Sequence, residues 1–391
     1  MPAVRKRKPS IDSGSILAEA LGRSFPRIDL PIHPPYPSAE AKAVKEIPRD
    51  SGWLYEPKWD GFRCLAFRSG DKIILQSKAG QPLARYFPEV VKTLRTIPAR
   101  KFVLDGELVI RGEAGLDFDA LLQRIHPAES RIRKLSQQTP ATYLVFDLLV
   151  DARGKRLTSE PLSARRMALQ EFAAANIRAD QSSSLTPRSG IQLSPATSDV
   201  TKAKQWMQHG SARGLDGVVA KRLDCEYTSG ERIGMVKVKR IRTADCVVGG
   251  FRWAQKGGEV GSLLLGLYND SGELDHIGFS SSFSKEERRK LKSILTPLIA
   301  KGSSGSVAHQ AGFTGKAPGG PSRWTREDRN TEWFPLKHKL VGEFQYDHFS
   351  GGRFRHGTKF LRWRPDKDPH QCGMEQVAPA ATGSALKELS F

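Results

Sequence analysis

The stretch EPKWDGFR at residues 56–63 places a lysine, an aspartate, a glycine and an arginine at short, fixed spacing. The surrounding pattern predicts a strand on each side of Lys58, which puts this lysine in a connecting loop. Gly61 follows closely and lets the backbone approach a ligand. A lysine amine attacks an electrophile only in its neutral form. An isolated lysine here would be a surface residue before a turn, so the other motifs of the chain must decide its role.

Two strand-like stretches further along the chain carry paired charges on one face. Alternation places Asp105 and Glu107 on the same side of LDGEL, and it does the same for Lys237 and Lys239 in VKVK. A pair of carboxylates can bind a hard cation or a ribose hydroxyl. Two ammonium groups repel each other, so an anion bound by both would account for the lysine pair. Ordinary solvated strand faces are the alternative for both stretches.

The KxDGxR pattern that begins at Lys58 resembles the signature of the nucleotidyltransferases that form a covalent lysine–nucleoside monophosphate. These are the ATP-dependent DNA ligases, the RNA ligases and the messenger-RNA capping enzymes. The other motifs follow in family order, and the resemblance extends from about Leu30 to Cys372. The chain is most similar to the short bacterial ATP-dependent DNA ligases. The resemblance implies an α+β fold, in which a nucleotide-grasp adenylation domain of antiparallel sheets with helices precedes an OB-fold β-barrel domain.

The resemblance also assigns roles to individual side chains. Lys58 is the nucleophile that accepts AMP. Phe146 in YLVFD stacks on the purine, whereas a core phenylalanine is the alternative for such an apolar strand. Lys78 stands where the family has an arginine, so the charge is kept but the planar fork of a guanidinium is lost. The implied ATP-binding side chains are Glu56, Arg63, Lys78, Glu107, Phe146, Lys221, Lys237 and Lys239.

Two further pairs of residues are assigned by the same resemblance. Glu107 and Asp216 hold Mg²⁺ or Mn²⁺. The family has a glutamate at the position of Asp216, and the shorter side chain favours a water-mediated contact with the metal. Near the end of the second domain, RPDK resembles the motif RxDK, in which Arg364 and Lys367 orient the leaving pyrophosphate. A basic patch that holds DNA is the alternative role for this pair.

The implied function is an ATP-dependent DNA ligase that seals nicked double-stranded DNA through lysyl-AMP and a 5′-adenylated strand, as in DNA repair. An RNA ligase or a capping enzyme remains the nearest alternative. A non-catalytic DNA-binding protein on the same scaffold is the alternative from another class, and the retention of Lys58, Glu107, Lys237 and Lys239 argues against it. The pattern identifies no protein partner, and we expect a monomer.

The composition favours an anionic partner. The 391 residues carry a formal net charge of +20. Nucleic acid is the first candidate, an acidic membrane surface is the second, and a merely solubilising surface is the alternative. The chain has no apolar run long enough to cross a bilayer and no secretory signal, so we expect a cytoplasmic protein associated with the nucleoid. The four scattered cysteines lack a CxxC pair, which favours reduced thiols over a zinc site or a disulfide framework.

The pattern along the chain predicts four parts. These are a basic flexible leader over residues 1–29, a domain over 30–240 that the resemblance implies is the adenylation domain, a second domain over 241–372 and a disordered tail over 373–391. The short strands of the second domain suit a small barrel, which the resemblance implies is an OB-fold, but the pattern alone also fits a sandwich. The first 50 residues or so read mostly as an extended leader. Residues 182–198 are expected to form a connection and residues 302–322 a mobile loop. Helices are expected over 88–96, 163–175 and 200–209, and a capping box at Ser284 predicts another. Strands are expected over 61–68, 72–77, 102–110, 142–150, 246–251, 262–268, 274–280, 333–346 and 360–363.

Overall fold

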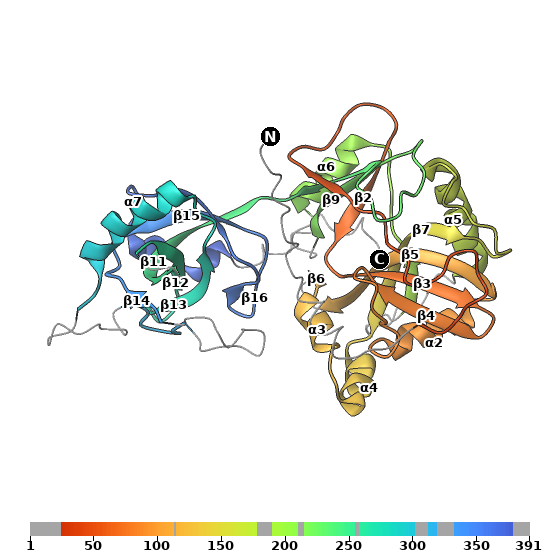
Figure 1. The fold of residues 1–391 in the computed structure, drawn as a ribbon, viewed down its shortest axis with the longest axis horizontal. Helices are drawn as coiled ribbons and strands as arrows, with labels where there is room; N and C mark the ends of the chain where they lie inside the picture. The colour runs from red at the N-terminus through yellow and green to blue at the C-terminus, as the bar shows by residue number, and fades with distance from the viewer. Residues whose placement is uncertain are drawn as a thin grey trace, which may run out of the picture. The chain divides into compact units, whose positions relative to one another are not determined.

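The computed structural model describes residues 25–112, 115–177, 190–209, 215–254, 258–301, 312–318 and 332–377. The chain forms two compact units, which divide between Lys239 and Arg240 (Figure 1). Strand β10 (Met235–Lys239) closes the first unit and β11 (Arg242–Trp253) opens the second. Only Arg240 and Ile241 lie between these strands, and Ile241 is 65% exposed. The linker is therefore very short.

The first unit contains two main sheets. The larger has the strand order β4-β3-β5-β7-β8, with β6 beside β5, and the smaller has the order β1-β10-β9-β2. All neighbouring strands are antiparallel except the parallel pairs β1–β10 and β7–β8. The remaining strands are β1 (Lys42–Val44), β2 (Trp53–Trp59), β3 (Phe62–Ser69), β4 (Lys72–Ser77), β5 (Lys101–Gly112), β6 (Gly115–Leu116), β7 (Ala141–Val150), β8 (Gly190–Leu193) and β9 (Leu215–Arg222).

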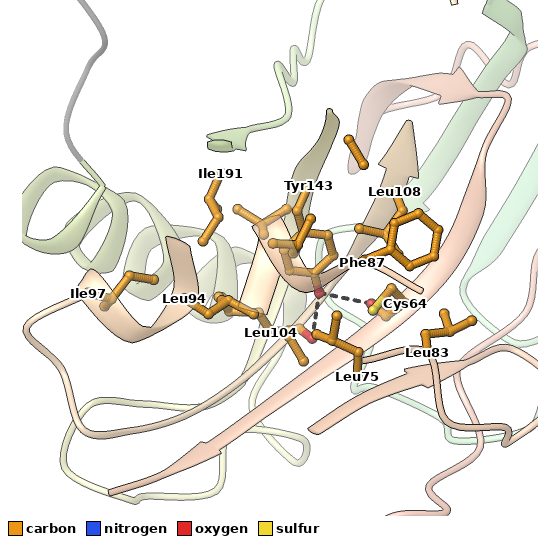
Figure 2. Packing of buried hydrophobic residues seen from close by; sticks show 14 of the residues in the cluster. Cys64, Leu75, Leu83, Phe87, Leu94, Ile97, Leu104, Leu108, Tyr143 and Ile191 are labelled. Atoms are coloured by element: carbon orange, nitrogen blue, oxygen red, sulfur yellow. Dashed lines mark hydrogen bonds between the residues drawn. The ribbon is translucent and has the colours of Figure 1, made fainter. Parts of the chain in front are cut away.

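Helices pack on both sheets and complete the α+β architecture that the sequence predicts. Helices α2 and α5 contact the larger sheet, and α6 contacts the smaller one. All ten residues of β7 are buried. In the core of the larger sheet, the Tyr143 hydroxyl lies 2.8 Å from the Cys64 carbonyl oxygen and 3.0 Å from that of Leu104 (Figure 2). The helices are α2 (Pro88–Thr96), α3 (Phe118–Gln123), α4 (Glu129–Gln138), α5 (Leu162–Asn176) and α6 (Val200–His209).

The segment before β1 has no regular secondary structure over residues 25–41, and it is packed against the first unit. Ile28, Leu30 and Ile32 are buried in a cluster that includes Phe67 of β3. Their alternate spacing is that of an extended chain with one apolar face. The expected flexible leader over residues 1–29 lies mostly outside the described residues, and its end at Ile28 belongs to a core.

The second unit is built on one sheet with the order β13-β12-β11-β15-β18, with β14 beside β11, and a separate hairpin of β16 and β17. Register shifts in β11 mark bulges, which bend a strand as a small barrel requires. Helix α7 (Lys285–Leu295) begins at the predicted capping box of Ser284 and Glu287. This architecture agrees with the predicted OB-fold. The other strands are β12 (Val260–Tyr268), β13 (Leu274–Ser280), β14 (Phe334–Pro335), β15 (Val341–Tyr346), β16 (Phe349–Ser350), β17 (Arg353–Phe354) and β18 (Lys359–Trp363).

Two segments differ from the sequence-based expectation, and a third lies mostly outside the described residues. The connection expected over 182–198 contains β8, which pairs in parallel with β7. The expected loop over 302–322 lies outside the described residues except for 312–318, where the Thr314 hydroxyl accepts a hydrogen bond from the Leu274 amide. The expected tail begins too early, because Met374–Gln376 form a 3₁₀ helix, η5, and Val377 is buried.

Within the described ranges, no helix has the length and apolar character of a membrane span. The four cysteines are free thiols. Cys64, Cys246 and Cys372 are buried, and Cys225 is partly exposed.

Candidate active site

Lys58 lies within β2, one residue before its end, and not in a connecting loop as the sequence predicts. Strand β2 is paired with β9 up to its last residue, and this pairing places Lys58 opposite Gly217. Gly217 has φ +143°, and a Cβ there would overlap the carbonyl oxygen of Val238 in β10. The close approach of β9 and β10 therefore needs a glycine at this position. It brings Lys58 and the lysines of β10 to one part of the smaller sheet.

Lys58 is the centre of a charged cluster. Its Nζ lies 2.5 Å from Oδ2 of Asp216, whose side chain is only 5% exposed. The Nζ of Lys239 lies 3.7 Å from the same oxygen. Burial lowers the pKa of Lys237, and the nearby charges of Lys58, Lys78 and Lys239 lower it further. Two of the predicted site lysines thus lie at one buried carboxylate, and Lys237 is close enough to feel their charges, so the cluster has positive charge to offer an anion.

Asp105 and Glu107 share a face of β5, as predicted, but their surroundings differ. Asp105 is fully buried and accepts two hydrogen bonds of 2.6 Å from Arg63, which fix the guanidinium. The hydroxyl of Tyr227 donates a third hydrogen bond to Asp105 at 2.6 Å. Burial raises the pKa of Glu107 to about 7, against the opposing charges of Arg63 and Lys58. Asp105 therefore holds Arg63 in place, while Glu107 faces the lysine cluster.

Two cations lie over the ring of Phe146 in β7. The guanidinium carbon of Arg63 lies 4.5 Å from the ring centroid, and Nζ of Lys221 lies 4.4 Å from it. The ring is 7% exposed. This exposure alone does not decide between the stacking residue and the core residue that the sequence allows. Cations over an aromatic ring are attracted by its π-face. The contacts link Arg63, Phe146 and Lys221 in one group.

Glu56 extends this group into the interior. Its Oε2 forms an ion pair of 2.7 Å with Nζ of Lys221, and both side chains are buried. Its Oε1 lies 3.7 Å from Nη1 of Arg166 and has no hydrogen-bond donor among the described residues. A buried acceptor with spare capacity is costly unless a ligand uses it. Sequence reasoning missed Arg166, although the two adjacent arginines at 165 and 166, the only basic residues of this helix and both buried, were a visible signal.

Lys78 lies at the edge of this arrangement. Its side chain is 58% exposed, and Nζ lies 3.2 Å from Glu40. Glu40 also forms an ion pair of 2.9 Å with Arg232. The charge of Lys78 also lowers the pKa of Lys237. The structure thus places Lys78 near the lysine cluster but on the surface, where an exposed ion pair with Glu40 can exchange readily.

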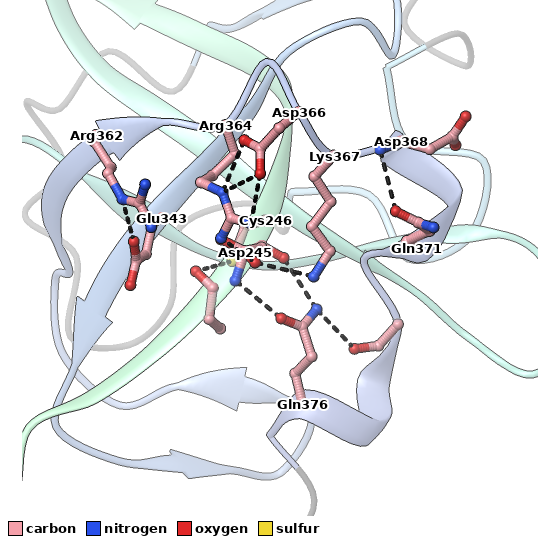
Figure 3. Close-up of polar contacts among 12 residues, drawn as sticks. Asp245, Cys246, Glu343, Arg362, Arg364, Asp366, Lys367, Asp368, Gln371 and Gln376 are labelled. Carbon is pink, nitrogen blue, oxygen red and sulfur yellow. Dashed lines mark hydrogen bonds and ion pairs between the residues drawn. The ribbon is translucent and has the colours of Figure 1, made fainter.

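Arg364 and Lys367 belong to the second unit and share one carboxylate. Nη1 of Arg364 and Nζ of Lys367 each lie 2.9 Å from Oδ2 of Asp245 (Figure 3). Arg364 also forms an ion pair of 2.9 Å with Asp366. The sequence placed the two cations in one motif but gave no signal of Asp245, which lies about 120 residues earlier. Asp245 thus joins the two cations of the motif in one network of ion pairs.

The donor set around Lys58 fits a hard divalent cation. Mg²⁺ is usually held by one or two carboxylates together with water and substrate phosphates. Asp216 contacts Lys58 directly, and Glu107 is close enough for the charge of Lys58 to act on it. No group of three or more metal-ligating side chains occurs within the described part of the chain, so a metal here would depend on substrate oxygens.

The comparisons with known proteins agree with this geometry. A sequence model described as "ATP dependent DNA ligase domain" matches residues 37–239, and one described as "ATP dependent DNA ligase C terminal region" matches residues 256–367. DNA ligase C of Mycobacterium tuberculosis is 42% identical over 361 residues, which cover 91% of this chain and 98% of that protein. DNA ligase C1 of Mycolicibacterium smegmatis is 44% identical over 361 residues, covering 90% and 96%.

A solved structure, Pmar-Lig_Pre, shares the fold. Its TM-score is 0.51 at 18% identity, over 84% of this chain and 67% of that one. Both units of the chain are thus matched by sequence, and the relatives are matched over nearly their whole length. The chain belongs to the family of ATP-dependent DNA ligases.

Proposed function

We propose that Lys58 is the residue that carries AMP. Its Nζ attacks the α-phosphorus of ATP, the bond from that phosphorus to the bridging oxygen breaks, and pyrophosphate leaves. The observation that carries this proposal is the position of Lys58 beside Asp216, with Lys237 and Lys239 close by. Asp216 lies within hydrogen-bonding distance to receive the amine proton. Cations held in place before the reaction stabilise the charge that develops on the phosphate.

The next two steps transfer AMP and seal the strand. The 5′-phosphate at a DNA nick attacks the phosphorus of lysyl-AMP, which breaks the N–P bond and forms a phosphoanhydride. The 3′-hydroxyl then attacks the 5′-phosphate, a phosphodiester forms and AMP leaves. The net charge of +20 supports binding to nicked duplex DNA through its phosphates and an association with the nucleoid. We expect the protein to act as a monomer.

The buried group around Phe146 supports recognition of adenine. The ring of Phe146 and the planar guanidinium of Arg63 offer stacking surfaces for a purine, and Lys221 adds a cation beside them. The free acceptor Oε1 of Glu56 suits the exocyclic amino group of adenine, which donates hydrogen bonds. Guanine has a carbonyl at the corresponding ring position and would leave two acceptors facing each other. This contrast supports ATP over GTP.

A bound Mg²⁺ or Mn²⁺ would neutralise and orient the phosphates, held by Glu107 and Asp216. Arg364 and Lys367 would orient the leaving pyrophosphate, in line with their place in the second unit's RPDK motif. Lys78 would supply a surface charge near the phosphates. Family membership in the DNA ligases decides against the RNA ligase, the capping enzyme and the non-catalytic scaffold.

Mass spectrometry of the purified protein after incubation with ATP and Mg²⁺ tests the assignment of Lys58. We expect one AMP on the peptide that contains Lys58, and none on the Lys58→Ala variant, because an alanine offers no nucleophile. Lys42→Ala is a matched control, since Lys42 is an exposed lysine of β1 in the same sheet. AMP on another residue of the Lys58→Ala variant, or loss of labelling in the control, would contradict the assignment.

A further inference from the structure

Asp245 is a buried carboxylate that gathers two cations from a distant segment. It lies in β11, and its side chain is 12% exposed. Both of its oxygens accept hydrogen bonds of 2.9 Å from Nη1 of Arg364, and Oδ2 accepts another of 2.9 Å from Nζ of Lys367. Figure 3 shows the two cations converging on this side chain. One carboxylate therefore holds Arg364 and Lys367 as a pair, against their mutual repulsion.

The position of Asp245 is itself fixed on both sides. The side-chain amide of Gln376 accepts a hydrogen bond from the Asp245 amide at 3.0 Å and donates one to its carbonyl oxygen at 3.1 Å. Asp245 also lies opposite Glu343 in the ladder of β11 and β15. The carboxylate therefore has little freedom, because its strand lies in the middle of a sheet and Gln376 holds its backbone by two hydrogen bonds.

Arg364 has a second acidic partner of a different kind. Asp366 accepts hydrogen bonds from Nε of Arg364 at 3.0 Å and from Nη2 at 2.9 Å, so the guanidinium lies between two carboxylates. The side chain of Asp366 is 63% exposed, whereas that of Asp245 is 12% exposed. An exposed ion pair contributes little and exchanges readily, but breaking a buried pair by removing one partner is costly. The outer edge of Arg364 is thus the edge that phosphate oxygens can take over.

We propose that Asp245 is a positioning residue for the first step of ligation. It keeps Arg364 and Lys367 together and aimed as one unit, while Asp366 is the exchangeable partner that pyrophosphate oxygens replace. This inference rests on the proposed role of Arg364 and Lys367 in orienting pyrophosphate. Asp245 touches neither substrate nor nucleotide in this scheme and acts only through the two cations.

The test compares self-adenylation with the sealing of a nick that already carries 5′-adenylate. Asp245→Asn removes the charge with almost no change in shape. We expect it to slow self-adenylation about a hundredfold, the usual effect of displacing a catalytic group by about 1 Å, and to leave sealing of the adenylated nick within about threefold. Retained sealing and a single cooperative melting transition would show that the variant is folded.

A matched control and a double-mutant cycle complete the design. Glu343→Gln removes the neighbouring carboxylate, which pairs with Arg362 at 2.7 Å, and it should leave self-adenylation nearly unchanged. If Asp245 acts only through the two cations, then Asp245→Asn adds little to the loss caused by the double change Arg364→Ala with Lys367→Ala. Full additivity of the two losses would overturn the inference.

The outcomes separate this inference from the proposed function on which it rests. Normal self-adenylation in the double variant Arg364→Ala with Lys367→Ala would refute the pyrophosphate role itself. Slow self-adenylation in that double variant with normal rates in Asp245→Asn would refute only the positioning role. Faster self-adenylation in Asp245→Asn would also overturn it, because Asp245 would then restrain the cations. If Asp245→Asn does not fold, Gln376→Ala loosens the same carboxylate and should slow the first step selectively.

Discussion

Two carboxylates of the site illustrate how neighbours set the chemistry of a side chain. Asp105 is surrounded by donors from Arg63 and Tyr227, so its charge is satisfied. Glu107, two residues along the same strand, has burial as its largest influence, and its pKa rises to about 7. An acid with a raised pKa prefers its neutral form in the folded protein.

The raised pKa of Glu107 predicts a pH-dependent stability. Between its ordinary value of 4.5 and about 7, the folded state binds this proton more tightly than the unfolded state. The free energy of unfolding therefore falls as pH rises through this window. Replacing Glu107 by Gln removes this dependence. From pH 5 to pH 8, the free energy of unfolding of the variant should therefore rise by about 1–2 kcal/mol relative to that of the parent. Urea unfolding of both proteins at the two pH values measures this difference.

An exposed glutamate provides the control for Glu107. Glu129 of α4 is 66% exposed and pairs with Arg133. Glu129→Gln should show no comparable gain over this pH range. A constant difference between Glu107→Gln and the parent would mean that solvent reaches Glu107 more freely than its surroundings indicate.

The residues of the site could be predicted where the family resemblance covers them, because the resemblance, and not local spacing, relates motifs that lie far apart in sequence. The four motif stretches around Lys58, Glu107, Asp216 and Lys237 do meet, because each lies on a strand whose neighbours are set by the fold. Partners that lie far away in sequence could not be predicted in this way. Arg166 near Glu56 and Asp245 beneath Arg364 depend on tertiary packing, which local spacing does not encode.

At the scale of elements, periodic segments were predictable and short ones were not. The helices at Pro88–Thr96 and Val200–His209 have the expected bounds. Strand β8 has four residues in a segment rich in serine and proline, and its parallel pairing with β7 is a tertiary event. Helix α4 buries only Ile132, so its short sequence offers few apolar positions from which a helix could be predicted. Propensity fails where packing against a distant element decides the structure.

Because η5 packs against the second unit, we expect the stability of this unit to depend on residues after Cys372. A chain ended at Cys372 loses the two hydrogen bonds between Gln376 and Asp245 and the buried side chain of Val377. We expect the free energy of unfolding of the second unit to fall by about 2–4 kcal/mol. Differential scanning calorimetry of the truncated chain measures the change.

A longer truncation product is the matched control for this experiment. A chain ended at Pro379 keeps η5 and should unfold like the full chain. Equal melting temperatures for both truncations would show that η5 contributes nothing to the second unit.

At the scale of the whole molecule, the net charge of +20 predicts binding that depends on salt. Each phosphate contact releases condensed counterions from duplex DNA. With about four such contacts, affinity for nicked duplex should fall about a hundredfold between about 50 and 200 mM salt. Fluorescence anisotropy at several salt concentrations gives the slope. A nearly flat slope, or strong dependence on the sequence flanking the nick, would contradict binding through phosphates.

The linker of Arg240 and Ile241 has a consequence for how the two units meet. A partner on so short a tether is present at an effective concentration on the order of millimolar, however dilute the protein is. Encounters between the units are therefore first-order events, and dilution does not weaken them. If Arg364 and Lys367 orient pyrophosphate as proposed, a weak affinity for the nucleotide is therefore sufficient, and a weak affinity lets the second unit dissociate after each step.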